Sequence, residues 1–449
     1  ISECLVGSEM CIRDRIKSDV IDALSFFGLE IKDCALASTP AMFMTTKMLG
    51  CDGAVQITAS HHPWDRNGLK FFTPDGGLSG DEIKSILEYA EEHESGSCPE
   101  RLNLQEVDFM SVYCEHLCNM IRKGVKSDDY ERPLKGLKIV VDAGNGVGGF
   151  YAEKVLSPLG ADTTGSRYLE PDGMFPNHIP NPENETAMNS VREATLGAKA
   201  DLGVIFDTDV DRGGCVSSDG REINRNALVA LAAVIALENN PGGTVVTDSV
   251  TSAGLTEFIE KTLGGHHLRF KRGYKNVIDE AIRLEENGIN APLAIETSGH
   301  AAFRENYYLD DGAYLITKII IKAADMKKQG KKLYDLISEL KYPAEEKEIR
   351  LKISEEDFRA VGDRLLEELA DFAAKREDWQ IAPDSHEGIK IIFPKTESFF
   401  ILRQSVHDPV IPINFESAQN GGVKKAANSL YEFIKDFDGV DISPLKQIL

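Results

Sequence analysis

Four short apolar runs, separated by stretches of helical periodicity, most restrict the folds open to this chain. The runs are Leu137–Asp142, Leu202–Phe206, Thr244–Asp248 and Pro292–Glu296. Helical periodicity covers Ala227–Glu238, Ala253–Thr262, Val277–Glu286 and Ala313–Lys328. Buried strands that alternate with amphipathic helices indicate βαβ units and largely parallel sheets. In such sheets, ligands bind in the loops that follow the carboxyl ends of the strands.

A chain of 449 residues is too long for one hydrophobic core, so we expect several domains. Turn-rich or charged segments mark three boundaries, at Arg132–Gly136, Asn239–Gly243 and Lys341–Pro343. After the third boundary the pattern changes to a long charged helix, Glu355–Lys375, and strands at Ile389–Phe393 and Phe399–Arg403. We therefore predict consecutive α/β domains over 1–134, 135–241 and 242–343, with mixed, largely parallel sheets, and an α+β domain over 344–449.

The composition excludes some classes of partner. An apolar fraction of 42% and a charged fraction of 27% are typical of a soluble globular protein. The net charge of -23 argues against nucleic acid or an anionic membrane as partner. The longest apolar run, Ala227–Leu237, is shorter than the ~20 residues that cross a bilayer, and no signal-peptide pattern opens the sequence. We predict a cytoplasmic protein, and the sequence leaves a monomer and a homodimer open.

The eight cysteines form no regular framework, which favours reduced thiols. Cys114 and Cys118, with His116 between them, could face one another on a helix. A zinc site there would need a second pair of ligands, and none is spaced for it.

Three acidic residues follow directly after one apolar run, in the segment GVIFDTDVDRGG. Asp207, Asp209 and Asp211 occupy alternate positions, and carboxylates this close repel one another. A hard divalent cation would hold them together, and Arg212 could then bind a phosphate beside the metal. An EF-hand does not fit, because Arg212 and Ser218 stand where that loop requires glycine and glutamate. A solvated acidic turn is the alternative interpretation.

A second polar loop lies between two apolar strands in the segment QITASHHPWDRNGLKFF. Ser60 is followed by His61 and His62, and a serine oxygen becomes a nucleophile only when a base or a charge activates it. The Asn-Gly turn at 67–68 would bring Lys70 back toward Ser60, where a desolvated lysine can transfer a proton. The alternative is a polar turn with a partly buried histidine.

Two further loops carry polar side chains at alternate positions. Glu296, Ser298 and His300 suit a ligand rich in hydroxyl groups, because each can form a hydrogen bond with a sugar. The segment RQSVHDP offers a phosphate-sized group of donors, namely Arg403, Ser405 and His407. Charges are screened beyond ~8 Å, so a phosphate site in this acidic protein needs local cations. The loops supply Lys70, Arg212, Lys271, Arg304 and Arg403.

Together, and in this order, the four loops strongly resemble those of the α-D-phosphohexomutase family, the phosphoglucomutase and phosphomannomutase enzymes. The segments VVDAGNGVGG and PDGMFPNHIPNPE are also similar to that family, and the resemblance extends from about Ser38 to the C-terminus. It implies domains arranged around a central cleft and a mutase that interconverts hexose 1-phosphate and hexose 6-phosphate. It also implies Mg²⁺ as cofactor, a hexose 1,6-bisphosphate intermediate and glucose 1,6-bisphosphate as activator. The sequence leaves glucose and mannose phosphates open as substrates and favours glucosamine phosphate less.

The resemblance also implies a role for each candidate residue. Ser60 matches the phosphoserine, which with Asp207, Asp209 and Asp211 would complete the Mg²⁺ site. His61 and Lys70 match residues for proton transfer and phosphate contact, and Arg212 matches the arginine after the metal loop. Substrate contacts are implied for Lys271, Glu296, Ser298 and His300, and a grip on the distant phosphate for Arg403, Ser405 and His407.

The sequence departs from the family at several places. His62 and Asn414 stand where relatives often have asparagine and arginine. No segment matches the family's opening strand and its Thr-Ser-Gly-x-Arg-Gly loop, so we expect an incomplete sheet and one fewer phosphate contact in the first domain. Two alternatives follow. One is an inactive or impaired truncated homologue that binds sugar phosphates, and the other is a phosphatase of the haloacid dehalogenase type with Asp207 as nucleophile.

Overall fold

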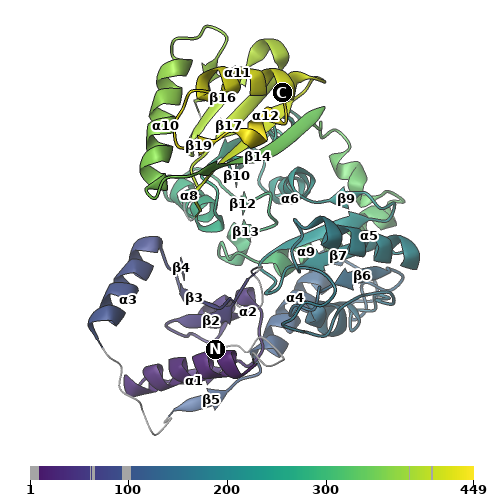
Figure 1. The fold of residues 1–449 in the computed structure, drawn as a ribbon. Helices are drawn as coiled ribbons and strands as arrows, with labels where there is room; N and C mark the ends of the chain where they lie inside the picture. Colours follow the sequence, from purple (N-terminus) through teal and green to yellow (C-terminus); the bar gives the residue numbers. More distant parts are fainter. Residues whose placement is uncertain (1–9, 61, 63–65, 94–102, 384, 406–407) are drawn as a thin grey trace. The chain divides into compact units, whose positions relative to one another are not determined.

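The computed structural model describes residues 10–60, 62, 66–93, 103–383, 385–405 and 408–449 (Figure 1). The chain forms two compact units, each built from separated segments of the sequence. The first unit comprises Ile1–Asn240 and Ala291–Ser338, and the second comprises Pro241–Asn290 and Glu339–Leu449. The finer division into four consecutive domains stays a prediction.

The N-terminal part of the first unit contains two small sheets. Its elements are α1 (Met10–Phe26), β1 (Ile31–Asp33), α2 (Thr39–Met48), β2 (Ala54–Thr58), β3 (Gly68–Thr73), β4 (Gly76–Gly77), α3 (Gly80–Glu92) and β5 (Leu104–Glu106). β1 pairs in parallel with β5, while β3 pairs antiparallel with both β2 and β4. We expected an incomplete sheet here, and the described strands of this region form two separate sheets.

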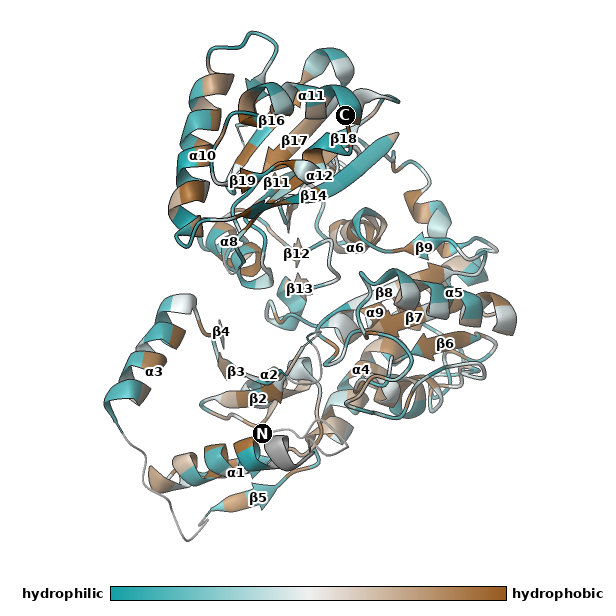
Figure 2. Cartoon of the chain, viewed as in Figure 1, coloured by the Kyte–Doolittle hydropathy of each residue, from teal (hydrophilic) through white to brown (hydrophobic). Residues whose placement is uncertain are grey.

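The metal-loop part of the first unit is a mixed four-stranded sheet. Its elements are α4 (Phe109–Val125), β6 (Ile139–Asp142), the π-helical turn η1 (Tyr151–Leu156), α5 (Glu185–Ala198), β7 (Leu202–Phe206), β8 (Gly213–Ser217) and β9 (Glu222–Ile223). The order is β6-β7-β8-β9, with β6 and β7 parallel and the remaining pairs antiparallel. β6 and β7 are coloured hydrophobic in Figure 2, and every residue of both strands is buried. Their ends therefore deliver side chains to one edge of a rigid core.

The remaining elements of the first unit are mostly helical. They are α6 (Asn226–Glu238), β12 (Leu293–Ile295), β13 (Ala301–Phe303), the 3₁₀ turn η3 (Arg304–Asn306), α9 (Gly312–Lys328) and the 3₁₀ turn η4 (Leu333–Ile337). α6 is apolar all round and almost wholly buried, as its sequence predicts. α9 begins at its N-cap Asp311, whose carboxylate accepts from the backbone N–H of Tyr314. This cap fixes the point at which the loop after β13 turns into the helix.

The second unit combines an α/β segment with a six-stranded antiparallel sheet. The first segment contains β10 (Thr244–Thr247), α7 (Ala253–Glu257), η2 (Phe258–Thr262), β11 (His266–Arg269) and α8 (Tyr274–Glu286). The second contains β14 (Glu345–Ile353), α10 (Phe358–Ala373), β15 (Gln380–Ile381), β16 (Ile389–Phe393), η5 (Pro394–Thr396), β17 (Ser398–Leu402), β18 (Val410–Ser417), α11 (Gly422–Ile434), β19 (Val440–Asp441) and α12 (Ser443–Lys446). The sheet order is β15-β16-β17-β18-β14-β19. One apolar core, which includes Leu365, Trp379 and Phe400, joins this sheet to its helices.

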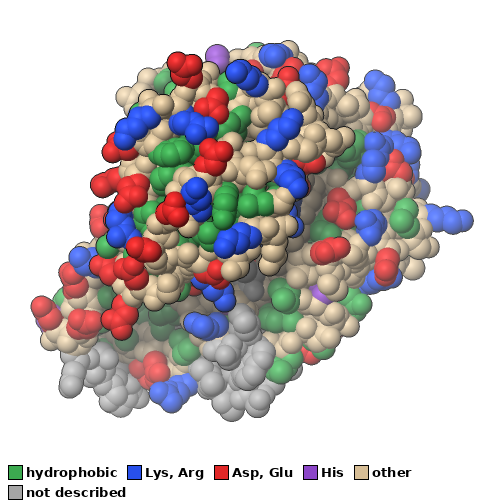
Figure 3. Space-filling view, turned by 45° about the horizontal axis from the view of Figure 1, so that its top comes forward, with side chains coloured by type: hydrophobic (Ala, Val, Ile, Leu, Met, Phe, Trp, Pro, Cys, Tyr) green, Lys and Arg blue, Asp and Glu red, His purple; other side chains and the backbone are tan. Residues whose placement is uncertain are grey.

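The predicted fold class is confirmed: α/β elements with mixed sheets precede a C-terminal α+β part. Parallel pairing is less common than we predicted, because β7–β8–β9 is an antiparallel meander and β12 pairs antiparallel with β13. On the face drawn in Figure 3, acidic and basic side chains are interspersed. Among the described residues, no helix has both the length and the apolar character that crossing a membrane demands.

Candidate active site

The loop between β7 and β8 places three carboxylates together in the first unit. Asp207, Asp209 and Asp211 are at most 2% exposed, and one ligand oxygen from each lies within 4.8 Å of the others. Val210 has φ +68°, a left-handed conformation that is strained for a β-branched residue. The N–H of Gly312 donates to the carbonyl of Val210 at 3.1 Å and helps to hold this conformation. This backbone outlier lies in the loop that carries the three buried aspartates.

Among the described residues, each of the three aspartates has one oxygen that accepts a hydrogen bond and one that accepts none, although Arg212 Nε and His300 Nδ1 approach two of the latter to 3.9 Å. Asp209 Oδ2 accepts from Thr39 Oγ1 at 2.6 Å, Thr58 Oγ1 at 3.1 Å and Lys70 Nζ at 2.9 Å. The other oxygens, Asp207 Oδ2, Asp209 Oδ1 and Asp211 Oδ1, are buried without a hydrogen-bond partner among the described residues. Buried acceptors without partners are costly, so these three oxygens call for a cation. The donor set, three carboxylate oxygens, fits a hard divalent ion such as Mg²⁺.

The surroundings shift the pKa values of Asp207 and Asp211 in opposite directions. Burial, together with the charges of Asp211 and Asp209, raises the pKa of Asp207 well above its ordinary value. Burial also opposes ionisation of Asp211, but Lys70, His300 and Arg212 outweigh it and lower that pKa. Without a cation the cluster therefore favours a proton on Asp207, and a bound cation would displace it.

Lys70, on β3, contacts the bonded oxygens of two of these acids. Its Nζ lies 2.6 Å from Asp211 Oδ2 and 2.9 Å from Asp209 Oδ2. Burial alone would lower the pKa of Lys70, but the two carboxylates raise it well above its ordinary value. The sequence predicted Lys70 near Ser60, and the described contacts of its ammonium are with the metal loop, where it holds its proton firmly.

Ser60 lies at the end of β2, in the loop that the sequence singled out. It has φ +50°, and its N–H donates to Thr58 Oγ1 at 2.8 Å. The same hydroxyl of Thr58 donates to Asp209, so a chain of two hydrogen bonds connects the Ser60 backbone to the metal loop. Backbone strain of this kind, at a non-glycine residue in the left-handed region, often occurs at functional sites. The neighbouring His61 lies outside the described residues.

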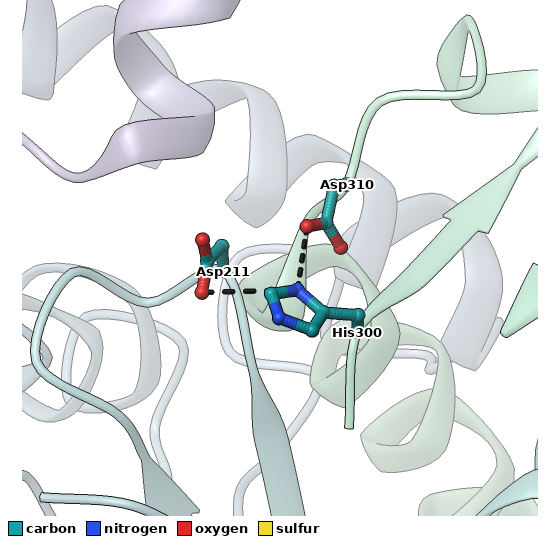
Figure 4. Close-up of side chains that lie close together, drawn as sticks. All are labelled: Asp211, His300 and Asp310. Atoms are coloured by element: carbon teal, nitrogen blue, oxygen red, sulfur yellow. Dashed lines mark hydrogen bonds and ion pairs between the residues drawn. The ribbon is translucent and has the colours of Figure 1, made fainter. Parts of the chain in front are cut away.

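His300 lies between the carboxylates of Asp211 and Asp310 (Figure 4). It also contacts Arg212. Its Nδ1 is 2.6 Å from Asp310 Oδ2 and 3.9 Å from Asp211 Oδ1. Arg212 Nε donates to His300 Nε2 at 2.8 Å, and a guanidinium cannot accept, so the neutral ring with its proton on Nδ1 fits this geometry. Burial lowers the pKa of His300 while Asp310 and Asp211 raise it to a value above the ordinary one, so protonation would compete with the Arg212 bond.

The two other candidate residues of the loop 296–300, which contains His300, are also buried. Glu296 and Ser298 are 4% and 5% exposed, and Ser298 Oγ lies 3.5 Å from Glu296 Oε2. The backbone of the loop is anchored because Gly213 N–H donates to the carbonyl of Gly299 at 3.3 Å. Two loops predicted separately, 207–212 and 296–300, are therefore packed against each other.

Of the remaining predicted residues, all but Arg304 belong to the second unit. Arg403 is 4% exposed, and its Nη2 donates to Asn414 Oδ1 at 2.9 Å. Ser405 Oγ accepts from the N–H of Asp408, and Lys271 is exposed after β11. His407 lies outside the described residues. Arg304, counted among the local cations, is exposed in the first unit and donates to Asn240.

Comparison with known proteins identifies the family. Models of the three α/β/α domains I, II and III of phosphoglucomutase/phosphomannomutase match residues 13–96, 111–220 and 224–342. The chain belongs to the phosphoglucomutase/phosphomannomutase family. A phosphoglucomutase/phosphomannomutase of Thermococcus kodakarensis is 32% identical over 409 residues, which cover 90% of this chain and 83% of the relative. A phosphoglucomutase of Neisseria gonorrhoeae is 29% identical over 89% of this chain and 81% of the relative.

Solved structures support the same fold. A phosphoglucomutase/phosphomannomutase family protein from Burkholderia thailandensis superposes with a TM-score of 0.77 at 25% identity, covering 96% of this chain and 87% of the other. The predicted family is therefore confirmed, while the roles of individual site residues stay predictions.

Two residues of this site were not predicted. Thr39 contacts Asp209 through both its hydroxyl and its N–H, yet Ser-Thr-Pro at 38–40 indicates only the start of a helix. Asp310 was also missed, because its neighbour Asp311 is the helix cap and the pair resembles an ordinary N-terminus. The only signal for Asp310 was its proximity in sequence to His300.

Proposed function

We propose that this chain is a Mg²⁺-dependent phosphohexose mutase acting on glucose phosphates, mannose phosphates or both. Its family makes it an isomerase of the phosphohexose mutase class. The observation that carries the metal dependence is the set of three buried, unpartnered oxygens from Asp207, Asp209 and Asp211. Their chemistry favours Mg²⁺, and an oxygen of phosphorylated Ser60 would complete the ligand set.

A bound Mg²⁺ would neutralise charge that develops on the transferring phosphoryl group. The remaining work falls to the side chains of this chain. Phosphorylated Ser60 gives its phosphoryl group to a sugar hydroxyl: the bond from phosphorus to Oγ breaks, and a bond to the sugar oxygen forms. The hydroxyl proton leaves to a base, for which His61 and Lys70 are the candidates. Lys70 starts protonated, because Asp209 and Asp211 raise its pKa, which suits it better to return a proton to Ser60 Oγ.

Arg212 would contact the transferring phosphate from beside the metal loop. Its Nε is occupied by His300, and this bond orients the rest of the guanidinium. Glu296, Ser298, His300 and Lys271 would contact the sugar, whose hydroxyls suit the buried acceptors and donors of the first three. The transfer yields a hexose 1,6-bisphosphate, whose other phosphate then returns to Ser60. Added glucose 1,6-bisphosphate would act as an activator because it rephosphorylates a dephosphorylated Ser60.

Arg403, Ser405 and His407 would bind the phosphate that does not react. Arg403 supports this role, because its Nε is buried and has no hydrogen-bond partner among the described residues. Binding energy at this distant group positions the reacting end of the sugar. We also propose that the four predicted domains are the functional parts, each supplying one of the four loops.

A coupled assay on glucose 1-phosphate and mannose 1-phosphate, with Mg²⁺ and a trace of glucose 1,6-bisphosphate, tests the proposal. We expect turnover of at least one sugar and its loss in EDTA. Intact-mass analysis should find one phosphate on the purified protein that is absent from Ser60→Ala. Phosphate on Asp207 would instead support a phosphatase, and a protein with neither phosphate nor turnover would support the inactive homologue.

A further inference from the structure

A buried histidine outside the proposed catalytic groups forms an ion pair behind the metal loop. The side chain of His178 is 2% exposed, and its Nε2 lies 3.0 Å from Asp142 Oδ1. Its Nδ1 lies 3.0 Å from the carbonyl oxygen of Ile179. The carbonyl can only accept, so Nδ1 donates to it. An imidazolium, which also donates from Nε2 to the Asp142 carboxylate, fits both contacts.

Asp142, at the end of β6, is fully buried and well supplied with donors. Its Oδ1 accepts from the N–H of Gly144 at 3.0 Å as well as from His178, and its Oδ2 accepts from Ser190 Oγ at 2.6 Å. Three donors therefore converge on this one carboxyl group. Burial lowers the pKa of His178, but the bond to Asp142 and its charge outweigh this and raise the pKa above its ordinary value. Asp142 is the charged group in contact with the His178 ring, and Ser190, on α5, donates to Asp142. The ring of Tyr168 packs edge-on against the His178 ring, with the two centroids 5.5 Å apart.

The turn that follows Asp142 packs directly against the backbone of the metal loop. The N–H of Val147 donates to the carbonyl of Thr208 at 2.9 Å. A Cβ at Gly146 would lie 2.7 Å from the same carbonyl oxygen, so only glycine permits this approach. Thr208 stands between Asp207 and Asp209, so a shift of the turn would displace the two acids.

The chain that follows His178 leads toward the proposed phosphate contact. Pro182 is held because Asn224 Nδ2 donates to its carbonyl at 2.7 Å. Glu183 comes next, and its Oε2 lies 3.9 Å from Arg212 Nη1. His178 thus joins two segments: one behind the metal loop, and one that carries a carboxylate to Arg212.

We propose that His178 is a positioning residue, whose imidazolium ties the turn behind the metal loop to the segment that carries Glu183. It does not touch the reacting atoms. It acts by fixing the spacing of the Asp207 and Asp209 oxygens through Asp142 and Thr208. This inference rests on the proposed function, because the loop that it supports is the proposed metal site.

Titration of the full chain with Mn²⁺, followed by electron paramagnetic resonance, tests this role without an activity assay. We expect His178→Asn to weaken Mn²⁺ binding about tenfold, as losing a group that orients metal ligands commonly does. His267→Asn is the matched control. His267 bonds through both ring nitrogens to the hydroxyls of Thr247 and Thr256, in the second unit, and burial lowers its pKa. This control should bind Mn²⁺ as the wild type does.

A second measurement keeps the test decisive if His178→Asn does not fold. Ring ¹⁵N shifts of the wild-type protein at neutral pH should show both nitrogens of His178 protonated. Ser190→Ala, which removes a donor to Asp142, should weaken Mn²⁺ binding, as His178→Asn does. Equal Mn²⁺ affinity in the wild type and both histidine variants, or a neutral His178 ring, would overturn this inference and leave the proposed metal site standing. A wild-type protein that binds no Mn²⁺ at all would overturn the proposed metal site.

Discussion

Lys70 Nζ donates to Asp209 Oδ2 at 2.9 Å, although the two residues are 139 positions apart in the chain. The bond connects the hairpin after Ser60 to the loop after β7. It uses Asp209 Oδ2, so Oδ1, which has no hydrogen-bond partner among the described residues, stays available. The bond therefore holds the hairpin that follows Ser60 against the loop that carries the three aspartates.

The first prediction concerns Lys70→Met in the absence of metal. Lys70 is the cation nearest to two buried carboxylates, and breaking a buried ion pair costs about 3 kcal/mol or more. We expect the free energy of unfolding in EDTA to fall by that amount, and the loss to shrink in saturating Mg²⁺, because the ion offsets the same charges. Urea denaturation with and without Mg²⁺ measures both values. An equal loss under the two conditions would contradict the assignment.

The second prediction concerns Asp209→Asn. The substitution replaces a charged carboxylate oxygen of the proposed metal site with a neutral amide. Turnover should therefore fall by about 100-fold or more, while the protein stays folded. Asp219→Asn is the control, because Asp219 lies in the β8–β9 turn and pairs only with Arg221 and Lys332 in the described structure. Steady-state rates and circular dichroism of the two variants decide the case. Near-full activity in Asp209→Asn would show that Asp209 is not a ligand of a catalytic metal ion.

The metal loop could be predicted from sequence because its signal is local. An apolar run is followed at once by acids at alternate positions, and both features survive in the structure as β7 and the buried trio. The strands and helices of the apolar periodic segments were also predicted closely; α6 and α9 each begin one residue before the predicted range.

The contacts that complete the site could not be predicted, because they depend on pairing between distant segments. Thr39 and Asp209 are 170 positions apart, and no local pattern connects them. The antiparallel β7–β8–β9 meander was missed for a similar reason, since buried strands have the same composition in either orientation. His178 lies in the segment PDGMFPNHIPNPE, but its partner Asp142 is 36 positions earlier, and no local pattern connects the two.

The third prediction concerns Arg403→Lys. Arg403 is held by Asn414 and Glu387, and lysine has no planar fork with which to keep these bonds and also bind a phosphate. We expect kcat/KM for the hexose phosphate to fall about 100-fold, with Mn²⁺ affinity unchanged. Arg304→Lys, at an exposed arginine bonded to Asn240, is the control and should leave kcat/KM near the wild-type value. A matching fall in both variants would contradict a specific role for Arg403.

The last prediction follows from Asp311, the N-cap of α9. Burial raises its pKa to about 7, although the N–H of Tyr314 and the side chains of Tyr113 and Asn306 donate to it and oppose the shift. The pKa of the folded state thus exceeds the unfolded value of 3.8. Between these two values the folded protein binds the extra proton, so the free energy of unfolding decreases as the pH rises through this window. Above it the decrease is complete and amounts to about 4 kcal/mol.

Asp311→Asn should remove this dependence, because the amide oxygen can still cap Tyr314 and never ionises. The difference in unfolding free energy between variant and wild type should therefore shift in favour of the variant between about pH 4 and about pH 8. Asp108→Asn is the matched control: Asp108 caps α4, and its bonds to Ser111 lower its pKa, so its contribution is constant over most of that range and is lost only in acid. If the two variants changed in parallel with pH, Asp311 would be ionised throughout, and the three donors around it would outweigh its burial.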